Sequence, residues 1–265
     1  MCTSFALHAE KTYIGMNFDI SDRPIKMALI KDNQLIIFQK ENGSFFPAFG
    51  LNRNGTFMNL LMVDPNENGK YRRGKNCVHI MKLFDDVLSE RIEVSSLNDY
   101  LTEKKIVNVP NYSVHSMIAG IDRHSFVVEP GRENLSLDSF DQDFMVLTNF
   151  PFEADQYYNE VSGDGSDRYQ KAYHSLLNCK ESFQVNEGFS ILEGTIQTEG
   201  DYPTQLSMIS VPEEQVIYFT LKGNFNKIFM FSFHDNQIQT HIGFEFSNHH
   251  SLSKKGILLS ELESW

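Results

Sequence analysis

CTSFAL at residues 2–7 and TYIGMN at residues 12–17 are strand-like runs on either side of a polar turn, HAEK at residues 8–11. This alternation around a turn predicts that the chain opens with a β-hairpin. With Ala9 and Glu10 at the centre of the turn, Cys2 pairs with Asn17, and Asp19 has the same parity as Asn17. The sequence therefore predicts that the side chains of Cys2 and Asp19 lie on one face of a sheet.

Cys2 directly follows Met1. A small side chain at the second position normally permits removal of Met1, which would leave Cys2 with a free α-amine. An α-amine has an ordinary pKa of about 7.7–8.0 and can take the thiol proton near neutral pH without a histidine. Cys2 is therefore a candidate nucleophile that carries its own base, and a carboxylate at Asp19 could bond the resulting ammonium. A cysteine at position two is weak evidence by itself, and an acid at a strand end is often simply solvated.

The composition excludes several classes of protein. The chain has 265 residues, a formal net charge of -12, and only short basic clusters at residues 72–73 and 104–105, so we expect no nucleic-acid partner. Three cysteines fit a reducing compartment better than a disulfide framework. We see neither a signal peptide nor a run of about twenty apolar residues, and therefore predict a cytoplasmic protein without a membrane partner.

Apolar periodicity organises the rest of the chain. Strands are expected at residues 27–30, 34–38, 57–63, 115–119, 125–129, 145–149, 206–211, 215–221, 227–233 and 238–246. Helices are expected at residues 77–93, 95–101, with Ser95 or Ser96 as cap, and 167–177. No Pro/Gly/Ser linker divides the chain, so residues 1–265 are expected to form a single α+β domain.

Several short motifs then follow one another in a familiar order. They are Met1-Cys2-Thr3 with Gly15-Met16-Asn17-Phe18-Asp19, Asn52-Arg53-Asn54-Gly55, His115-Ser116-Met117-Ile118-Ala119 with Val127-Val128-Glu129, Leu147-Thr148-Asn149-Phe150-Pro151, Ser166-Asp167-Arg168-Tyr169 and Tyr202-Pro203-Thr204-Gln205. Together they resemble the choloylglycine hydrolase and penicillin V acylase family, including the isopenicillin N acyltransferase-like proteins. The resemblance covers most of the chain. It implies the four-layer αββα fold of N-terminal-nucleophile hydrolases, in which two antiparallel sheets stack between helical layers.

The resemblance also implies roles for individual residues. Cys2 would be the nucleophile and, through its amine, the base, while Asp19 would hold that amine. Asn149 would donate to the tetrahedral oxyanion, and Arg168 would favour the thiolate. A second oxyanion donor is expected near residues 62–64. The implied activity is hydrolysis of a linear amide C–N bond through a thioester, with no cofactor and no metal.

Two departures from the family keep alternatives open. Met16 stands where the choloylglycine branch carries an arginine beside the nucleophile, and a thioether cannot replace a cation. The segment between Asn149 and Arg168 is shorter than in bile salt hydrolases, so a homo-oligomer is possible but their tetramer is not expected. The same scaffold could act as an acyltransferase, or as a non-catalytic binding protein that retains Met1.

Candidate substrates are small-molecule amides with an apolar acyl group: conjugated bile acids, phenoxyacetyl penicillins, N-acyl homoserine lactones and acyl-amino acids or peptides.

Other residue groups rank lower. Cys77 with His79 or His115 could form a thiol–histidine pair, but Cys77 begins an amphipathic pattern typical of packing. His249 and His250 lack a third metal ligand at suitable spacing. The turn at residues 163–166 has no lysine and does not follow a strand, so it does not match a phosphate loop and is expected to shape the approach to Arg168.

Overall fold

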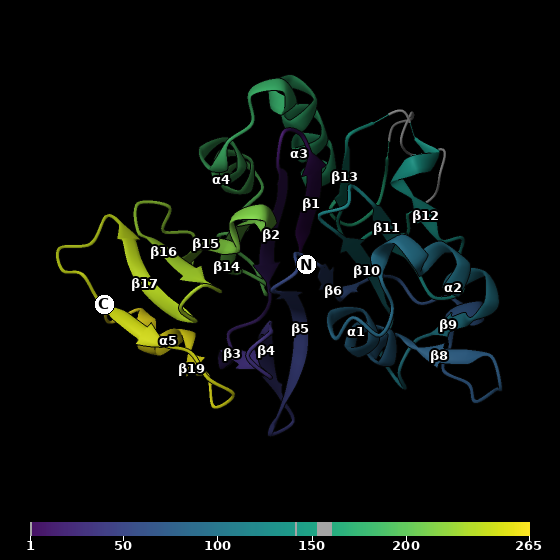
Figure 1. The fold of residues 1–265 in the computed structure, drawn as a ribbon. Helices are drawn as coiled ribbons and strands as arrows, with labels where there is room; N and C mark the ends of the chain where they lie inside the picture. The colour runs from purple at the N-terminus through teal and green to yellow at the C-terminus, as the bar shows by residue number, and fades with distance from the viewer. Residues whose placement is uncertain (1, 141, 153–160) are drawn as a thin grey trace.

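A computed structural model describes residues 2–140, 142–152 and 161–265. Its core is a pair of large antiparallel sheets (Figure 1). The first sheet has the order β13 (Phe144–Leu147), β1 (Thr3–His8), β2 (Thr12–Asp19), β14 (Thr204–Val211), β15 (Val216–Leu221), β16 (Ile228–Ser232), β17 (Gln237–Ile242) and β18 (His249–Ser251).

The second sheet has the order β12 (Leu135–Ser136), β11 (Ser125–Val128), β10 (Val114–Ala119), β6 (Phe57–Asn59), β5 (Ser44–Asn52), β4 (Gln34–Glu41), β3 (Ile25–Ile30) and β19 (Ile257–Leu258), with β7 (Leu61–Met62) also paired to β10. A small parallel pair joins β8 (Cys77–His79) to β9 (Lys105–Val107).

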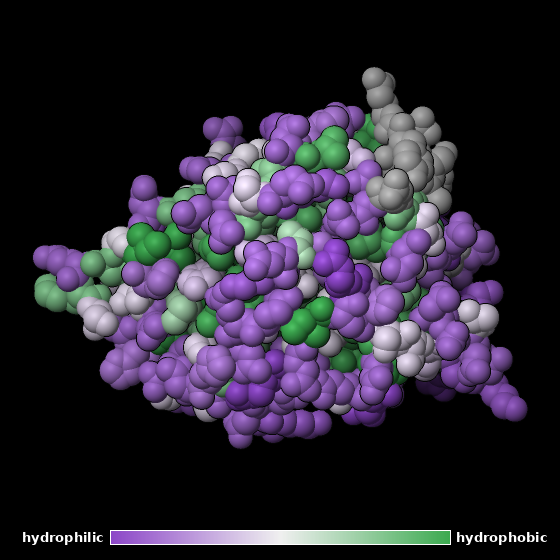
Figure 2. Space-filling model, turned by 45° about the horizontal axis from the view of Figure 1, so that its top comes forward, coloured by the Kyte–Doolittle hydropathy of each residue, from purple (hydrophilic) through white to green (hydrophobic). Residues whose placement is uncertain are grey.

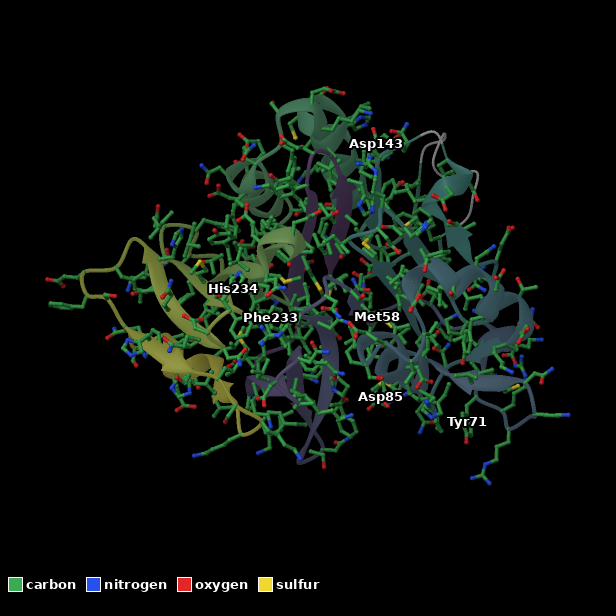
Figure 3. All side chains as sticks on the ribbon, viewed as in Figure 1. Met58, Tyr71, Asp85, Asp143, Phe233 and His234 are labelled. Atoms are coloured by element: carbon green, nitrogen blue, oxygen red, sulfur yellow. The ribbon has the colours of Figure 1, made fainter. Side chains whose placement is uncertain are left out.

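Helices cover both outer faces. The helices are α1 (Ile80–Leu88), α2 (Leu97–Glu103), α3 (Ser166–Cys179), α4 (Val185–Gly194) and the short C-terminal α5 (Leu259–Leu262). Apolar residues of α1 and α2 pack in one cluster with the outward-facing residues of the second sheet, among them Met58 of β6 (Figure 3). Buried residues of α3 and α4 instead join the main core with the first sheet. The order of layers is therefore α, β, β, α, which confirms the predicted fold class.

The space between the sheets is filled mainly by large apolar side chains. Phe18 of β2 meets Phe49 of β5 edge to face, with ring centroids 5.6 Å apart. Within the first sheet, Phe5 pairs with Gly15, and a Cβ at Gly15 would lie 2.2 Å from the Phe5 ring. Glycine is therefore required beneath this ring, which ties the β1–β2 hairpin to the core.

The outer surface has a different character. The face shown in Figure 2 is mostly hydrophilic, with small separate hydrophobic areas, as expected for a chain with 22% charged residues. In the part of the chain that the structure describes, no helix combines the length and apolar character needed to cross a bilayer.

The predicted hairpin forms, but its register is shifted by one residue. His8 pairs with Thr12 and Thr3 pairs with Asn17, so the turn is centred on Glu10 and has three residues. The prediction that Cys2 pairs with Asn17 was wrong, because a three-residue loop replaced the assumed even-numbered one. Since a one-residue slip exchanges the faces of a strand, Cys2 does not share the parity of Asp19.

Other elements were placed with mixed success. The helix predicted at residues 77–93 is shorter, because Cys77 and His79 belong to β8 and α1 covers only Ile80–Leu88. The predicted strand at residues 57–63 is broken at Leu60 into β6 and β7. The hairpin around Lys31 was correctly placed, with Ile30 opposite Gln34. β5 and α4 were not predicted.

Candidate active site

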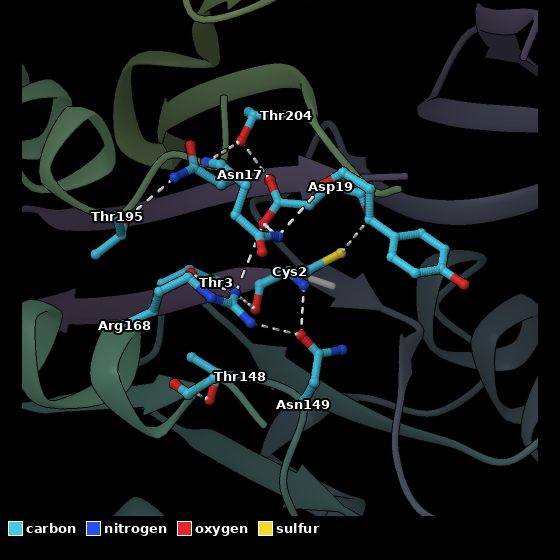
Figure 4. Close-up of polar contacts among 12 residues, drawn as sticks. Cys2, Thr3, Asn17, Asp19, Thr148, Asn149, Arg168, Thr195 and Thr204 are labelled. Carbon is cyan, nitrogen blue, oxygen red and sulfur yellow. Dashed lines mark hydrogen bonds and ion pairs between the residues drawn. The ribbon is translucent and has the colours of Figure 1, made fainter. Parts of the chain in front are cut away.

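Cys2 lies just before β1 and is 6% exposed. Its backbone nitrogen donates to Asn149 Oδ1 at 2.5 Å, and its Sγ lies 3.8 Å from the Asp19 carbonyl oxygen (Figure 4). Burial raises the pKa of the Cys2 thiol above its ordinary value, and the nearby charge of Asp19 raises it further, whereas Arg168 lowers it. Formation of a thiolate therefore depends on the positive groups that surround this cysteine.

Arg168 is the side chain that connects the site. It lies in the first turn of α3, is 4% exposed, and donates through Nη1 to the Cys2 carbonyl oxygen at 2.7 Å and to Thr3 Oγ1 at 3.0 Å. Nη2 donates to Asn149 Oδ1 at 3.4 Å, and Nη1 lies 3.6 Å from Asp19 Oδ2. A cation in the first turn opposes the helix dipole. These acceptors and the Asp19 carboxylate offset that cost and hold the guanidinium beside Cys2.

The turn before α3 allows this placement. Gly165 has φ +84°, and a Cβ there would lie 2.5 Å from Arg168 Nη2. Its carbonyl oxygen also accepts from Thr148 Oγ1 at 3.1 Å, next to Asn149 in the sequence. The expectation that residues 163–166 shape the approach to Arg168 thus agrees with the geometry.

Asp19 ends β2 and is 3% exposed. Its Oδ1 accepts from Thr204 Oγ1 at 2.6 Å and its Oδ2 from Gln197 Nε2 at 2.8 Å. Burial raises the pKa of Asp19 to about 6, although the Thr204 hydroxyl and the Arg168 charge both act to lower it. Thr204 and Gln197 were not predicted as site residues, and only Thr204 lay within a motif that could have identified it.

The raised pKa of Asp19 predicts a specific pH dependence of stability. Between the ordinary pKa of 3.8 and the folded value of about 6, the native state holds a proton that the unfolded state has released. The free energy of unfolding contributed by this group is therefore greatest below about pH 4 and falls as the pH rises through 6. Urea unfolding of the wild type and of Asp19→Asn at pH 4, 5, 6 and 7 should show that the free energy of unfolding of the wild type, relative to that of the variant, falls as the pH rises from 4 to 7. Parallel pH profiles for the two proteins would contradict it.

Asn149 follows β13 and is 5% exposed. Its Oδ1 accepts from both Cys2 and Arg168, and its Nδ2 donates to the Met62 carbonyl oxygen at 2.7 Å. The predicted second oxyanion region at residues 62–64 is therefore in contact with Asn149. Within that region the Val63 N–H already donates to the Ser113 carbonyl oxygen.

Met16 lies in β2, on the sheet face to which the alternation along β1 also assigns Cys2. It is fully buried within β2, pairs with Ser4 and Met208, and belongs to the main hydrophobic core. Ser4 Oγ contacts Met117 Sδ of the second sheet at 3.7 Å. The side of the first sheet that carries Ser4 and its pairing partner Met16 therefore faces the space between the two sheets. Met16 therefore adds an apolar contact on that side, and the cation beside Cys2 is Arg168.

The lower-ranked residue groups have other roles. His79 Nδ1 accepts from the Lys82 N–H at 3.0 Å and caps α1, while half-buried Cys77 pairs with Lys105. Both ring nitrogens of His115 have partners, Glu129 and the Thr148 carbonyl oxygen. Among the described residues there is no group of three or more His, Cys, Asp or Glu that could hold a metal ion.

A groove of about 540 Å³ lies between α3 and α4, but its residues do not form a second candidate catalytic site. His174 and Ser175 line it, but neighbouring residues on a helix point in different directions and cannot form a nucleophile–base pair. The residues that line the groove include none of those around Cys2.

Comparison with solved structures identifies the fold. Conjugated bile acid hydrolase from Clostridium perfringens, in a cysteine-to-alanine mutant, superposes with a TM-score of 0.65 and 19% identity over 96% of this chain and 98% of that chain. Penicillin V acylase from Agrobacterium tumefaciens gives 0.65 and 15% over 90% of each chain. The Caenorhabditis elegans ortholog of N-acylethanolamine-hydrolyzing acid amidase gives 0.51 and 17% over 80% of this chain and 93% of that chain.

No family model matches the sequence, and neither does any curated protein. The resemblance inferred from the motifs is confirmed by these neighbours at the level of the fold: the chain has the αββα architecture of the N-terminal-nucleophile hydrolases.

Proposed function

We propose that this protein is an amidohydrolase that cleaves linear amides with Cys2 as an N-terminal nucleophile. The observation that carries the proposal is the convergence of Asp19, Asn149 and Arg168 on Cys2 from three separate parts of the chain. Arg168 contacts the other three residues, and all four are at most 6% exposed. A fixed cation beside a thiol can activate it as a nucleophile, and a primary amide can donate to a developing oxyanion, so this set of groups suits acyl transfer.

The proposed reaction begins with removal of Met1, which lies outside the described residues. The free Cys2 amine takes the thiol proton, and Sγ attacks the amide carbonyl carbon. Asn149 Nδ2 has two hydrogens, of which one is donated to Met62, so the second can be donated to the oxyanion. The Cys2 ammonium then protonates the leaving nitrogen as the C–N bond breaks, which leaves a thioester and a free amine product.

The second half of the reaction releases the acid. Water gives a proton to the same amine and attacks the thioester carbonyl; collapse of that intermediate breaks the C–S bond, releases the acid, and returns the proton from the ammonium to the Cys2 thiolate. If a second amine takes the place of water, the product is a new amide. Asp19 and Arg168 form a buried ion pair beside Cys2; we assign the Asp19 charge to stabilise the ammonium form of the Cys2 amine and the Arg168 charge to favour the thiolate.

An apolar acyl group is the proposed substrate feature. Met62, whose carbonyl oxygen binds Asn149, is 53% exposed, and methionine is a flexible apolar residue that could contact such a group. Amides with aromatic or aliphatic acyl groups, including conjugated bile acids and penicillin V, form the panel to test.

Mass spectrometry of the N-terminus is the direct test. We expect protein purified from its native host to lack Met1, and brief exposure to a mixture of amide substrates at low pH to add the mass of one acyl group to the peptide that begins at Cys2. The second mass identifies the acyl preference as well as the residue modified. Retention of Met1 on the whole population, with no acyl adduct and no turnover, would instead support a binding protein that lacks chemistry.

A further inference from the structure

A buried histidine contacts the segment that carries Asn149 from the opposite sheet. His115 lies in β10 of the second sheet and is fully buried. Its Nε2 lies 2.6 Å from the carbonyl oxygen of Thr148. This oxygen belongs to the peptide bond that joins Thr148 to Asn149. Because a carbonyl oxygen can only accept, Nε2 carries the hydrogen and donates it.

A buried carboxylate contacts the other end of the same segment. Glu129 directly follows β11, is 1% exposed, and accepts from the Phe152 N–H through Oε2 at 3.1 Å. The same Oε2 lies 3.3 Å from His115 Nδ1, and Oε1 lies 2.6 Å from Arg132 Nε. His115 and Glu129 thus contact each other and, separately, the residues on both sides of Asn149.

We infer that His115 and Glu129 are positioning residues that set the orientation of the Asn149 amide for the oxyanion. This inference rests on the proposed amidohydrolase function. Asn149 comes from a loop, and a loop amide is aligned only if its backbone is held. The two contacts fix the backbone at Thr148 and Phe152, and the Asn149 contacts with Cys2, Arg168 and Met62 then fix the amide itself.

The burial of these groups supports a positioning role. Desolvating an imidazole and a carboxylate costs free energy, which hydrogen bonds and ion pairs with these groups offset. Here the two groups direct their hydrogen bonds at the backbone of one short loop in the facing sheet. A pair that served only packing would not require both bonds to flank the oxyanion asparagine.

The test separates two reactions of Cys2. Amide hydrolysis passes through an oxyanion, whereas alkylation of the thiol by iodoacetamide does not. His115→Ala should lower kcat about tenfold to a hundredfold, with KM and the rate of Cys2 alkylation each within about twofold of the wild type. His115→Gln, whose amide can still donate to the Thr148 oxygen, should recover most of kcat. Glu129→Gln serves as a second variant if the alanine protein does not fold.

A matched control comes from another buried histidine. His8 is 2% exposed and has two polar partners, Thr12 and Ser125, but it lies at the far end of β1, about 20 Å from Cys2 along the strand. His8→Ala should keep kcat within about threefold when assayed well below its melting temperature. Asn149→Ala is the reference for loss of the oxyanion donor and should lower kcat at least as far as His115→Ala does.

The outcomes are distinct. A kcat for His115→Ala within threefold of the wild type, or a parallel fall in hydrolysis and alkylation, would overturn the positioning role while leaving the amidohydrolase proposal in place. A wild type that hydrolyses no amide in the panel, or one that Cys2→Ala matches in rate, would overturn the proposed function and the oxyanion role with it.

Discussion

Cys2→Ala is expected to lower kcat/KM for amide hydrolysis by about 10⁴-fold or more, because the alanine protein cannot form the thioester. The backbone nitrogen that donates to Asn149 Oδ1 is retained in this variant, so the geometry of the site should be preserved. Binding of substrate should persist, and KM or Kd should change by less than about threefold. Steady-state kinetics with the best amide of the panel and equilibrium binding to the variant would measure both effects.

The two other cysteines supply the control. Cys77 is half-buried in β8, and Cys179 is half-buried at the end of α3. Replacing either with alanine should leave turnover within about twofold. If Cys77→Ala abolishes activity and Cys2→Ala does not, the nucleophile assignment is wrong.

Arg168→Met is expected to be the most destabilising substitution in the site, by about 3–5 kcal/mol near pH 7. It removes the donors to Cys2 and Thr3 and leaves the buried Asp19 carboxylate without this cation. The loss should be smaller at pH 5, because Asp19 has a pKa of about 6 and is mostly neutral there. Without the Arg168 charge, which lowers that pKa, Asp19 should hold its proton to still higher pH.

A double-mutant cycle isolates this pair. If Arg168→Met acts mainly by leaving Asp19 uncompensated, combining it with Asp19→Asn should destabilise the protein by less than the sum of the two single changes. Arg168→Lys keeps the charge but loses the planar set of donors, and should recover part of the stability but little of the activity. Strict additivity at pH 7 would show that the ion pair at 3.6 Å does not stabilise the site.

The four residues of the site were predicted from the sequence, and the structure brings them together. What could not be predicted was how they meet. The expected contact ran from Asp19 to the Cys2 amine along one sheet face, but the hairpin register differs by one residue. The number of residues in the turn determines that register, and the polar residues 8–11 are compatible with a turn that has either an even or an odd number of residues. The Asp19 carboxylate instead contacts Arg168, Thr204 and Gln197.

Elements with weak local signals show the same limit. β5 contains Pro47 and lacks regular alternation, yet it pairs with both β4 and β6, and its second half, residues 48–52, is buried. Cys77 and His79 continue an apolar pattern that suits a helix, but pairing with Lys105 and Val107 makes them a strand. In both cases contacts with distant residues override a local preference.

The parts of this protein that depend on residue type and local order could be predicted before the fold was known. These are a cysteine at the second position, strands and turns indicated by short-range alternation, and a series of motifs whose family resemblance implies Asp19, Asn149 and Arg168 as its partners. Three features became apparent only in the folded chain: the order in which strands pair across the sheets, the contacts of Arg168 with all the other site residues, and the contact of His115 in one sheet with the loop of the other. The physical reason is that strand pairing joins residues up to 232 positions apart, as between Lys26 and Leu258, and buried polar contacts join residues up to 185 positions apart; such contacts depend on the packing of the whole core, which no local stretch of sequence encodes.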